Sequence, residues 1–265
     1  MKSALALMIV AFSSALLWSQ TPLVHAHAHN DYEHDRPLLD ALHNGFVSVE
    51  ADVHAIDGRL YVVHDRPNDL TGVPTLEDAY LKPLMERAQL YRGKIFPGYQ
   101  GFFYLMIDIK TSAEQTYPLL RDELAKYEAM LSVVENDEDQ PQKAVKVFIS
   151  GNRPFEQLER DQVKYAGLDG RPGDLPSAYS AAMMPVISDH YRRFFASRDL
   201  EEIQPEEVIK LKAMVQQAHS EGRRVRLWAI PDHPDMWRFL RSLDVDLINT
   251  DHLSELREFF VAEGD

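Results

Sequence analysis

The sequence predicts an α/β fold made of parallel β/α units, and three observations support this prediction. Short apolar runs typical of buried strands alternate with amphipathic, helix-like segments along most of the chain. About eight such strands fit into the roughly 240 residues that follow the N-terminal segment. No strand is followed by a glycine-rich dinucleotide fingerprint or a P-loop, which argues against an open nucleotide-binding sheet. We therefore expect a single-domain, TIM-like (β/α)8 barrel.

The N-terminal segment is predicted to be a targeting signal and not part of the folded barrel. Met1 and Lys2 give a positive start, residues 4–18 form a short apolar run, and residues 19–22 end it. This layout is typical of a secretory signal peptide, and the run is too short to span a membrane with ease. We expect a signal peptide at residues 1–20 and the barrel at residues 21–265, without a transmembrane segment in the mature chain. A periplasmic or secreted location follows, with a retained N-terminal anchor as the alternative.

Composition excludes several classes of function. The chain has 265 residues, of which 45% are hydrophobic, so it can bury one large core. Its formal net charge of −14 argues against a nucleic-acid partner. It contains no cysteine, which rules out disulfides, a thiolate nucleophile and a cysteine-bound zinc ion. Any metal must therefore be held by oxygen and imidazole ligands, and the oligomeric state is left open.

The first half of the barrel follows from local patterns. Residues 36–44 predict a short helix that Gly45 ends, and residues 75–91 predict a second helix. Residues 101–110 form a nearly continuous apolar run, as expected of a strand buried on both faces. The expected strands of this half are residues 22–28, 46–53, 60–63 and 101–110.

The second half continues the alternation of strands and helices. Its weakest pattern is residues 161–180, where we expect a short strand at 163–168 and a loop. The other expected strands are residues 143–150, 183–188, 225–230 and 245–249. The expected helices are residues 113–134, 154–160, 205–221, 234–243 and 253–261.

Three acidic residues predict a metal site. Glu50 and Asp52 lie two positions apart on one strand and therefore point to the same face. Asp108 lies at the end of another strand, and the carboxyl ends of the strands meet in such a barrel. Three carboxylates in one barrel mouth repel each other strongly unless a cation lies between them. Oxygen ligands of this kind favour Mg²⁺ or Ca²⁺ over zinc.

Other polar residues at strand ends suggest acid–base chemistry. His29 and His64 follow the first and third expected strands, and two imidazoles beside a metal-bound anion can act as general base and general acid. Lys110 shares a strand face with Asp108 and can neutralise a substrate oxygen. Asp251 is expected to cap the last helix.

The order of short motifs resembles the phospholipase C-like phosphodiesterase superfamily. The motifs are HAHNDY, VEADV, DG, VVHD, MIDIK, LWAIPD and DLINTD. This superfamily includes glycerophosphodiester phosphodiesterases and phosphatidylinositol-specific phospholipases C on TIM-like barrels. Within it, the chain is most similar to a branch named after a yeast mitochondrial-inheritance protein.

The resemblance assigns roles to individual residues. It implies that His29 and His64 are catalytic, that Glu50, Asp52 and Asp108 bind the metal, and that Asn30 is a fourth ligand. Trp228 resembles the tryptophan that lines the glycerophosphodiesterase pocket. The HRG and ENT motifs of those enzymes are replaced by HAHND and HDRP, so glycerol is not implied as the substrate alcohol.

The expected activity is therefore metal-dependent cleavage of a small-molecule or lipid phosphodiester, glycerophosphodiester or phospholipid-like, which would place the enzyme in lipid metabolism. Two alternatives remain at this point. One is a metal-dependent amidohydrolase or PHP-type hydrolase that uses His27 and His29, and the other is a non-catalytic barrel that binds a phosphorylated or polyhydroxylated ligand.

Overall fold

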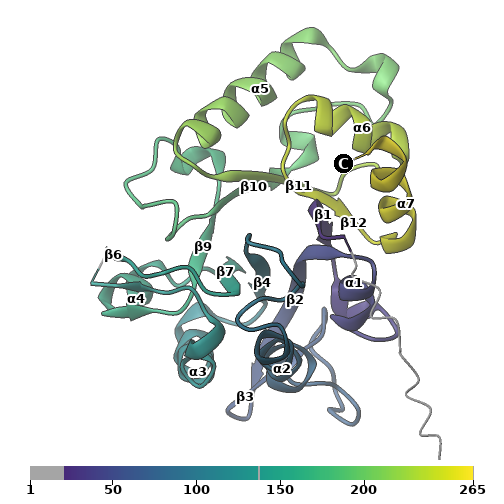
Figure 1. Cartoon of the computed structure of the whole chain (residues 1–265). Helices are drawn as coiled ribbons and strands as arrows, with labels where there is room; N and C mark the ends of the chain where they lie inside the picture. The colour runs from purple at the N-terminus through teal and green to yellow at the C-terminus, as the bar shows by residue number, and fades with distance from the viewer. Residues whose placement is uncertain (1–20, 137, 265) are drawn as a thin grey trace, which may run out of the picture.

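Eight parallel strands form a nearly closed barrel in the computed structural model, which describes residues 21–136 and 138–264 (Figure 1). Around the barrel the strands run in the order β11 (Arg224–Trp228), β10 (Val186–His190), β9 (Gly167–Gly170), β7 (Val145–Gly151), β4 (Phe103–Ile109), β2 (Phe46–Ile56), β1 (Leu23–Ala28) and β12 (Ile248–Thr250). A single bridge between Arg226 and Leu247 joins β11 to β12. The predicted single-domain (β/α)8 barrel is confirmed.

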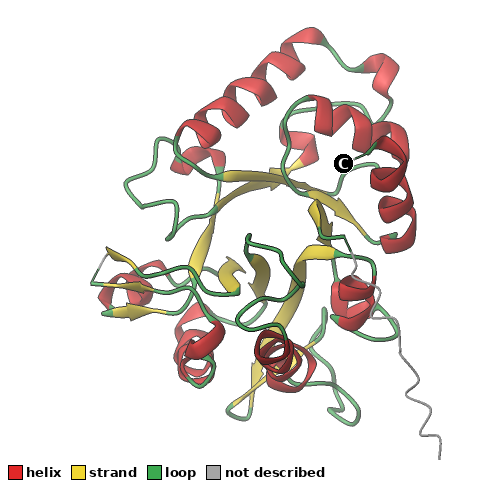
Figure 2. Ribbon diagram, in the orientation of Figure 1, coloured by secondary structure: helices red, strands yellow, loops and turns green. Residues whose placement is uncertain are grey.

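Helices surround the ring of strands, as Figure 2 shows. Each connection between neighbouring parallel strands must cross back over the barrel, and helices provide most of these crossovers. In the described part of the chain the α-helices are α1 (Leu39–His43), α2 (Lys82–Leu90), α3 (Ala113–Ala125), α4 (Phe155–Arg160), α5 (Pro205–Ser220), α6 (Pro234–Ser242) and α7 (Leu253–Glu263).

The core has two parts because each strand of the barrel has two faces. Along β4, Leu105, Ile107 and Ile109 belong to the large apolar cluster formed by strands and helices. Tyr104 and Met106 lie on the opposite face and join a smaller apolar cluster inside the barrel. Asp108 follows them on this inner face, nearer the carboxyl end of the strand. The barrel interior is therefore apolar at one end and acidic at the other.

The expected strand at 60–63 does not belong to the barrel. It corresponds to β3 (Arg59–Val62), which pairs antiparallel with β2 in a hairpin. The turn of this hairpin contains Asp57 and Gly58, both at positive φ, as a tight hairpin turn requires.

Residues 113–134 and 163–168 also differ from expectation. The helix ends at Ala125, because the chain then turns through η3 (Glu128–Met130) and reaches a run in which Val133 and Val134 favour extended backbone. That run enters a small antiparallel sheet of β6 (Glu138–Asp139), β5 (Val134–Glu135) and β8 (Val163–Lys164). The expected strand at 163–168 is thus divided between β8 and the barrel strand β9.

Gly45 ends α1 as predicted and also fixes the start of the barrel. Its φ is +86°, and a Cβ atom there would lie 2.5 Å from the carbonyl oxygen of Thr21. Only glycine fits both conditions. The signal peptide at residues 1–20 lies outside the described residues and stays a prediction, as does the domain boundary after it. Among the helices of the described residues, none combines the length and apolar character needed to cross a bilayer.

Candidate active site

Three carboxylates meet at the carboxyl ends of β2 and β4. The two strands are parallel neighbours, and their register places Asp52 opposite Asp108. Glu50 precedes Asp52 by two residues and points to the same side. One ligand oxygen from each of the three lies within 4.8 Å of the other two, and the described residues contain no other such group. The structure thus brings together the three residues that the sequence predicts as metal ligands.

Asp52 lies at the centre of this cluster and is fully buried. Its Oδ2 accepts a hydrogen bond from the Tyr32 hydroxyl at 2.7 Å, and lies 2.8 Å from His64 Nδ1 and 2.9 Å from Lys110 Nζ. Its Oδ1 is buried and has no hydrogen-bond partner. An unpaired buried polar atom costs about 1–3 kcal/mol. A cation bound by this oxygen would remove that cost, so the cluster fits a divalent ion with oxygen ligands.

Asp108 protonates more readily than an ordinary aspartate. Burial raises its pKa to about 6; the nearby Lys110 opposes this shift and the charges of Asp52 and Glu50 reinforce it. Lys110 Nζ lies 3.4 Å from Asp108 Oδ1. The space beside this carboxylate requires glycine at position 151, where a Cβ atom would lie 2.2 Å from Asp108 Oδ1. The predicted substrate-binding role of Lys110 stays a prediction, although its ammonium group does lie at the cluster.

Glu50 is held in its ionised form by a buried cation that the sequence analysis missed. Burial alone would favour the protonated acid, but the neighbouring His27 and the charge of Arg226 lower the pKa of Glu50 to about 2. Arg226 Nη1 lies 3.2 Å from Glu50 Oε2 and also donates to Asn249 Oδ1 at 2.9 Å. An arginine within the apolar strand expected at residues 225–230 was the available signal, since a buried charge needs a partner.

His27 lies inside the barrel and does not pair with His29 as a metal ligand. Its Nδ1 lies 2.7 Å from Ser48 Oγ and its Nε2 lies 3.0 Å from Arg226 Nη1, so both ring nitrogens are engaged. Burial and the neighbouring Arg226 lower the pKa of His27 to about 4, so its imidazole is neutral at pH 7. The geometry therefore gives no support to a zinc site at His27 and His29.

His29 follows β1 and is paired with Asp251. Its Nδ1 lies 2.8 Å from Asp251 Oδ1. Burial acts to lower the pKa of His29, but the hydrogen bond to Asp251 and the charge of Glu50 outweigh burial and raise it. The expectation that Asp251 caps the last helix is wrong, because His252 occupies that position and the Asp251 side chain reaches His29 instead. Asp232 Oδ2 holds the backbone N–H of Asp251 at 3.0 Å.

His64 reaches the cluster because of the β2–β3 hairpin. The return strand places Val63 N 3.1 Å from Asp52 O, so the next side chain lies beside Asp52. His64 Nδ1 is 2.8 Å from Asp52 Oδ2, and half of the side chain is exposed. The two predicted catalytic histidines thus each have a carboxylate partner, one outside the metal cluster and one within it.

Asn30 and Tyr32 lie beside the cluster in the loop after β1. Asn30 adopts a left-handed backbone with φ of 44°, and its Oδ1 lies 2.9 Å from the Tyr32 hydroxyl. The role of Asn30 as fourth ligand stays a prediction. Tyr32 was not singled out from the sequence, although its hydroxyl also lies 3.3 Å from His64 Nδ1. Burial and Asp52 raise the pKa of Tyr32, so it is a neutral hydrogen-bond donor.

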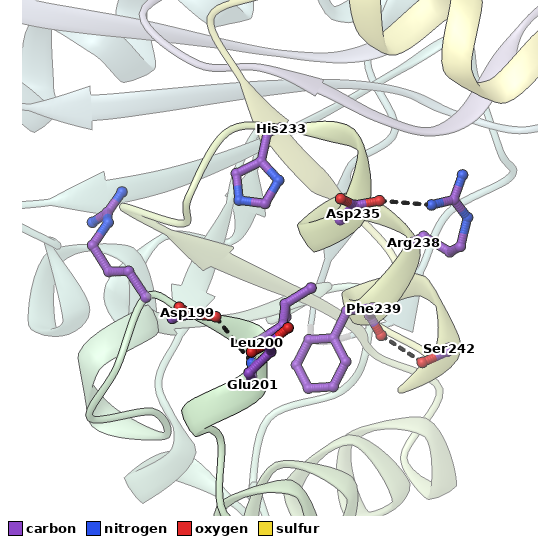
Figure 3. Close-up of a pocket in the computed structure, with 9 residues that line it drawn as sticks. Asp199, Leu200, Glu201, His233, Asp235, Arg238, Phe239 and Ser242 are labelled. Atoms are coloured by element: carbon purple, nitrogen blue, oxygen red, sulfur yellow. Dashed lines mark hydrogen bonds and ion pairs between the residues drawn. The ribbon is translucent and has the colours of Figure 1, made fainter.

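The predicted pocket residue Trp228 ends β11 and lines an open pocket of about 650 Å³. A larger open groove, of about 910 Å³, lies apart from all predicted site residues, between η6 (Leu200–Glu202) and α6 (Figure 3). His233, Asp235, Arg238 and Phe239 line one side of this groove. Its charges are mixed, and no carboxylate cluster lies there. The candidate active site is therefore the acidic barrel mouth and not this larger groove.

Comparisons with known proteins agree with this geometry. Residues 17–94 match the AIM6-like phosphodiesterase domain. The altered inheritance of mitochondria protein 6 homolog of Arthroderma benhamiae is 27% identical over 267 residues, which covers 88% of this chain and 83% of that protein. The Saccharomyces cerevisiae altered inheritance of mitochondria protein 6 is 26% identical, over 86% of this chain and 68% of that protein.

A solved structure shares the fold. A glycerophosphodiester phosphodiesterase from Parabacteroides distasonis aligns with a TM-score of 0.54 and 16% identity, over 92% of this chain and all of that one.

The expected periplasmic or secreted location is contradicted. The curated relatives carry names that refer to the inheritance of mitochondria, which point to mitochondria rather than to the periplasm or the cell exterior. A short apolar N-terminal run after a lysine does not separate export from other targeting on its own.

The motif order, the barrel and these matches agree. The resemblance of this chain to the phospholipase C-like phosphodiesterases, and among them to the AIM6-like phosphodiesterase branch, is confirmed.

Proposed function

We propose that this protein is a metal-dependent phosphodiesterase that cleaves a glycerophosphodiester or a phospholipid-like diester. The observation that carries the proposal is the carboxylate cluster of Glu50, Asp52 and Asp108, flanked by two histidines that each have a carboxylate partner. The similarity to phosphodiesterases supports phosphodiester hydrolysis as the reaction class. A solved phosphodiesterase from Oleispira antarctica, with a TM-score of 0.51, is described in complex with sn-glycerol-3-phosphate.

The metal ligands in this proposal are the three carboxylates, with Asn30 as a fourth oxygen donor. Mg²⁺ and Ca²⁺ both suit such ligands. When bound, the cation supplies Lewis acidity that polarises a phosphoryl oxygen and offsets charge developed in the transition state. Lys110, whose ammonium group is kept protonated by Asp108 and Asp52 in spite of partial burial, neutralises a second phosphoryl oxygen.

His29 and His64 divide the proton transfers. His29 takes a proton from the nucleophile, either water or a neighbouring substrate hydroxyl, and Asp251 stabilises the imidazolium that forms. Asp251 lies outside the metal cluster, so its charge is not shared with the cation. Asp52, the partner of His64, is itself a proposed metal ligand, so its charge would be shared with the cation. His64 therefore gives its proton to the leaving alcohol.

The test is cleavage of bis(p-nitrophenyl) phosphate and a panel of glycerophosphodiesters and lysophospholipids with Mg²⁺ or Ca²⁺. Replacing His29 or His64 with alanine should lower kcat by about 10²–10⁴-fold, as loss of an acid or base does. His43→Ala, on the exposed surface of α1, is the matched control and should retain activity. Calorimetry with each metal checks that the histidine variants still bind it.

Two results would contradict the proposal. Full activity of His29→Ala or His64→Ala would remove the assigned acid–base roles. Metal binding without turnover of any diester in the panel would indicate a ligand-binding barrel instead of an enzyme. The product also reports the nucleophile: a cyclic phosphate identifies a substrate hydroxyl, and an open-chain monoester without a cyclic intermediate identifies water.

A further inference from the structure

A second, cationic pocket adjoins the acidic barrel mouth. It has a volume of about 650 Å³ and lies at the carboxyl ends of β9, β10 and β11, which Figure 1 shows on the side of the ring covered by α5. Its polar and aromatic lining consists of Arg171, Asp189, His190, Arg193, Phe194, Lys210 and Trp228. The lining thus carries three cationic side chains and one carboxylate, in a chain whose net charge is −14. Asp169, buried beneath Arg171, offsets one of these positive charges.

Arg171 is fixed in place before any ligand arrives. Its Nη1 donates to Asp169 Oδ2 at 2.7 Å and to Gly170 O at 2.9 Å. Its Nη2 donates to Ser150 Oγ at 3.3 Å. Asp169 is fully buried below it, so the guanidinium group is anchored from the barrel side. Holding a long side chain in one position lowers the entropic cost of binding.

The other two cations are more exposed and less constrained. Arg193 Nε lies 3.9 Å from Asp189, and three quarters of its side chain is exposed. Lys210 is exposed on α5, donates to the carbonyl oxygen of Arg193 at 2.6 Å, and lies over the ring of Phe194. Both therefore keep their charge close to the pocket without a tight carboxylate partner, an arrangement that attracts anions.

The pocket connects to the metal site along two routes. Ser150, which binds Arg171, is the register partner of Asp108. Trp228 lies 5.8 Å from the guanidinium of Arg226, which in turn contacts Glu50 at 3.2 Å. A substrate whose phosphodiester lies at the carboxylates would therefore extend one of its alcohol groups toward the pocket.

Trp228 does not offer an open aromatic face to a cationic head group. Arg171 lies over its ring at 4.9 Å from the centroid, and the ring of His190 meets it edge-on at 6.1 Å. Recognition of a quaternary ammonium group depends on free aromatic faces and few neighbouring cations. This pocket has the opposite character, so choline is disfavoured on both counts.

We infer that the pocket formed by Arg171, Arg193, Lys210 and Trp228 binds a second anionic group, a phosphate or a carboxylate, carried by one alcohol of the substrate. This inference rests on the proposed function of the neighbouring site and specifies its substrate class. The enzyme then prefers diesters with an additional anionic group to neutral ones, and disfavours diesters of choline.

Three diesters that share one glyceryl phosphate test the preference. They are glycerophosphoglycerol, the same compound phosphorylated on its terminal hydroxyl, and glycerophosphocholine. Products are followed by mass spectrometry, so cleavage on either side of the phosphorus is detected. We expect kcat/KM to be highest for the phosphorylated diester and lowest for the choline diester, with about tenfold between successive members. Added salt should reduce these ratios.

The double variant Arg193→Gln, Lys210→Gln locates the preference. The ratio of kcat/KM between the phosphorylated and the neutral diester should fall at least fivefold in this variant. Lys212→Gln is the control matched to the Lys210→Gln half of this variant, because it removes one positive charge from the exposed surface of α5 outside the pocket, and it should keep the wild-type ratio. The inference would be overturned if glycerophosphocholine were cleaved as well as or better than the phosphorylated diester. It would also be overturned if the double variant kept the wild-type ratio.

The outcome also separates this inference from the proposed function. If no diester is cleaved with either metal, the proposed function fails, and the pocket is then tested by binding alone. Calorimetry without added metal should show binding of the phosphorylated diester to the wild-type protein, weaker binding of the neutral one, and loss of the difference in the double variant. Equal binding of both compounds would refute the pocket as well.

Discussion

Binding of a divalent cation should weaken as the pH falls below about 6. Burial raises the pKa of Asp108 to about 6, with Lys110 opposing the shift and the charges of Asp52 and Glu50 adding to it. A cation binds the carboxylate and not the protonated acid, so below this pH a proton must leave Asp108 as the cation binds. Because the pKa is raised, the competing proton is still present at pH 5, where an ordinary aspartate is already ionised.

The size of the effect follows from one competing proton. With a pKa of about 6, roughly ten elevenths of Asp108 is ionised at pH 7 and roughly one eleventh at pH 5. The association constant should therefore be about tenfold lower at pH 5 than at pH 7, a difference of about 1.4 kcal/mol. Glu50 adds nothing to this change, because its pKa is lowered to about 2 and it stays ionised throughout.

Calorimetric titration with MgCl2 and CaCl2 at pH 5, 6 and 7 measures the affinity. Repeating each titration in two buffers of different ionisation heat counts the released protons, with about 0.9 expected per cation at pH 5 and about 0.1 at pH 7. The double variant His29→Asn, His64→Asn controls for imidazolium charges that also repel a cation at low pH, and it should keep most of the change. Affinity that is constant from pH 5 to 7, with no proton release, would refute the reasoning.

Three further changes test the site and the fold. Asp251→Asn should lower kcat about 10–10³-fold and move the acidic limb of the pH profile to lower pH, because Asp251 raises the pKa of His29, the proposed base. Asp235→Asn, on the exposed surface of α6, is the control. Burial lowers the pKa of His27 to about 4, so between pH 6.5 and 4 the unfolded chain binds a proton that the folded chain does not. Urea unfolding should therefore show that the wild type loses roughly 3 kcal/mol of stability relative to His27→Gln as the pH drops from 6.5 to 4. Gly45→Ala should lower the free energy of unfolding more than Gly58→Ala does. Both glycines have positive φ, but only a Cβ atom at position 45 would lie 2.5 Å from a backbone oxygen. Equal losses would show that this close contact is relieved at no cost.

Much of the barrel could be predicted because its signals are local. The apolar run that becomes β4 and the glycine that ends α1 each depend on a few adjacent residues. The hairpin strand β3 could not be distinguished from a barrel strand, because its sequence shows only that it is extended and not which partner it pairs with. The same limit applies to residues 163–168, where two short strands belong to different sheets.

In the candidate site, too, local patterns could be predicted and pairings between distant residues could not. Glu50 and Asp52 are two residues apart, so strand periodicity alone predicts that they share a face. The pairing of His29 with Asp251 joins residues 222 positions apart and depends on β1 lying beside β12, which periodicity does not reveal. Arg226 was missed for a related reason, since its partners His27, Glu50 and Asn249 come from β1, β2 and β12.

Arg226 changes the electrostatic argument for the metal. From the sequence alone, three carboxylates in one barrel mouth require a cation to relieve their mutual repulsion. In the structure, Lys110 and Arg226 already offset two of these charges, which leaves the ionised cluster with one negative charge. A phosphodiester carries one negative charge and would be repelled by such a site. A bound divalent ion would reverse the sign to one positive charge. In the proposed function the cation would therefore serve less to hold the carboxylates together than to make the barrel mouth attractive to an anionic substrate.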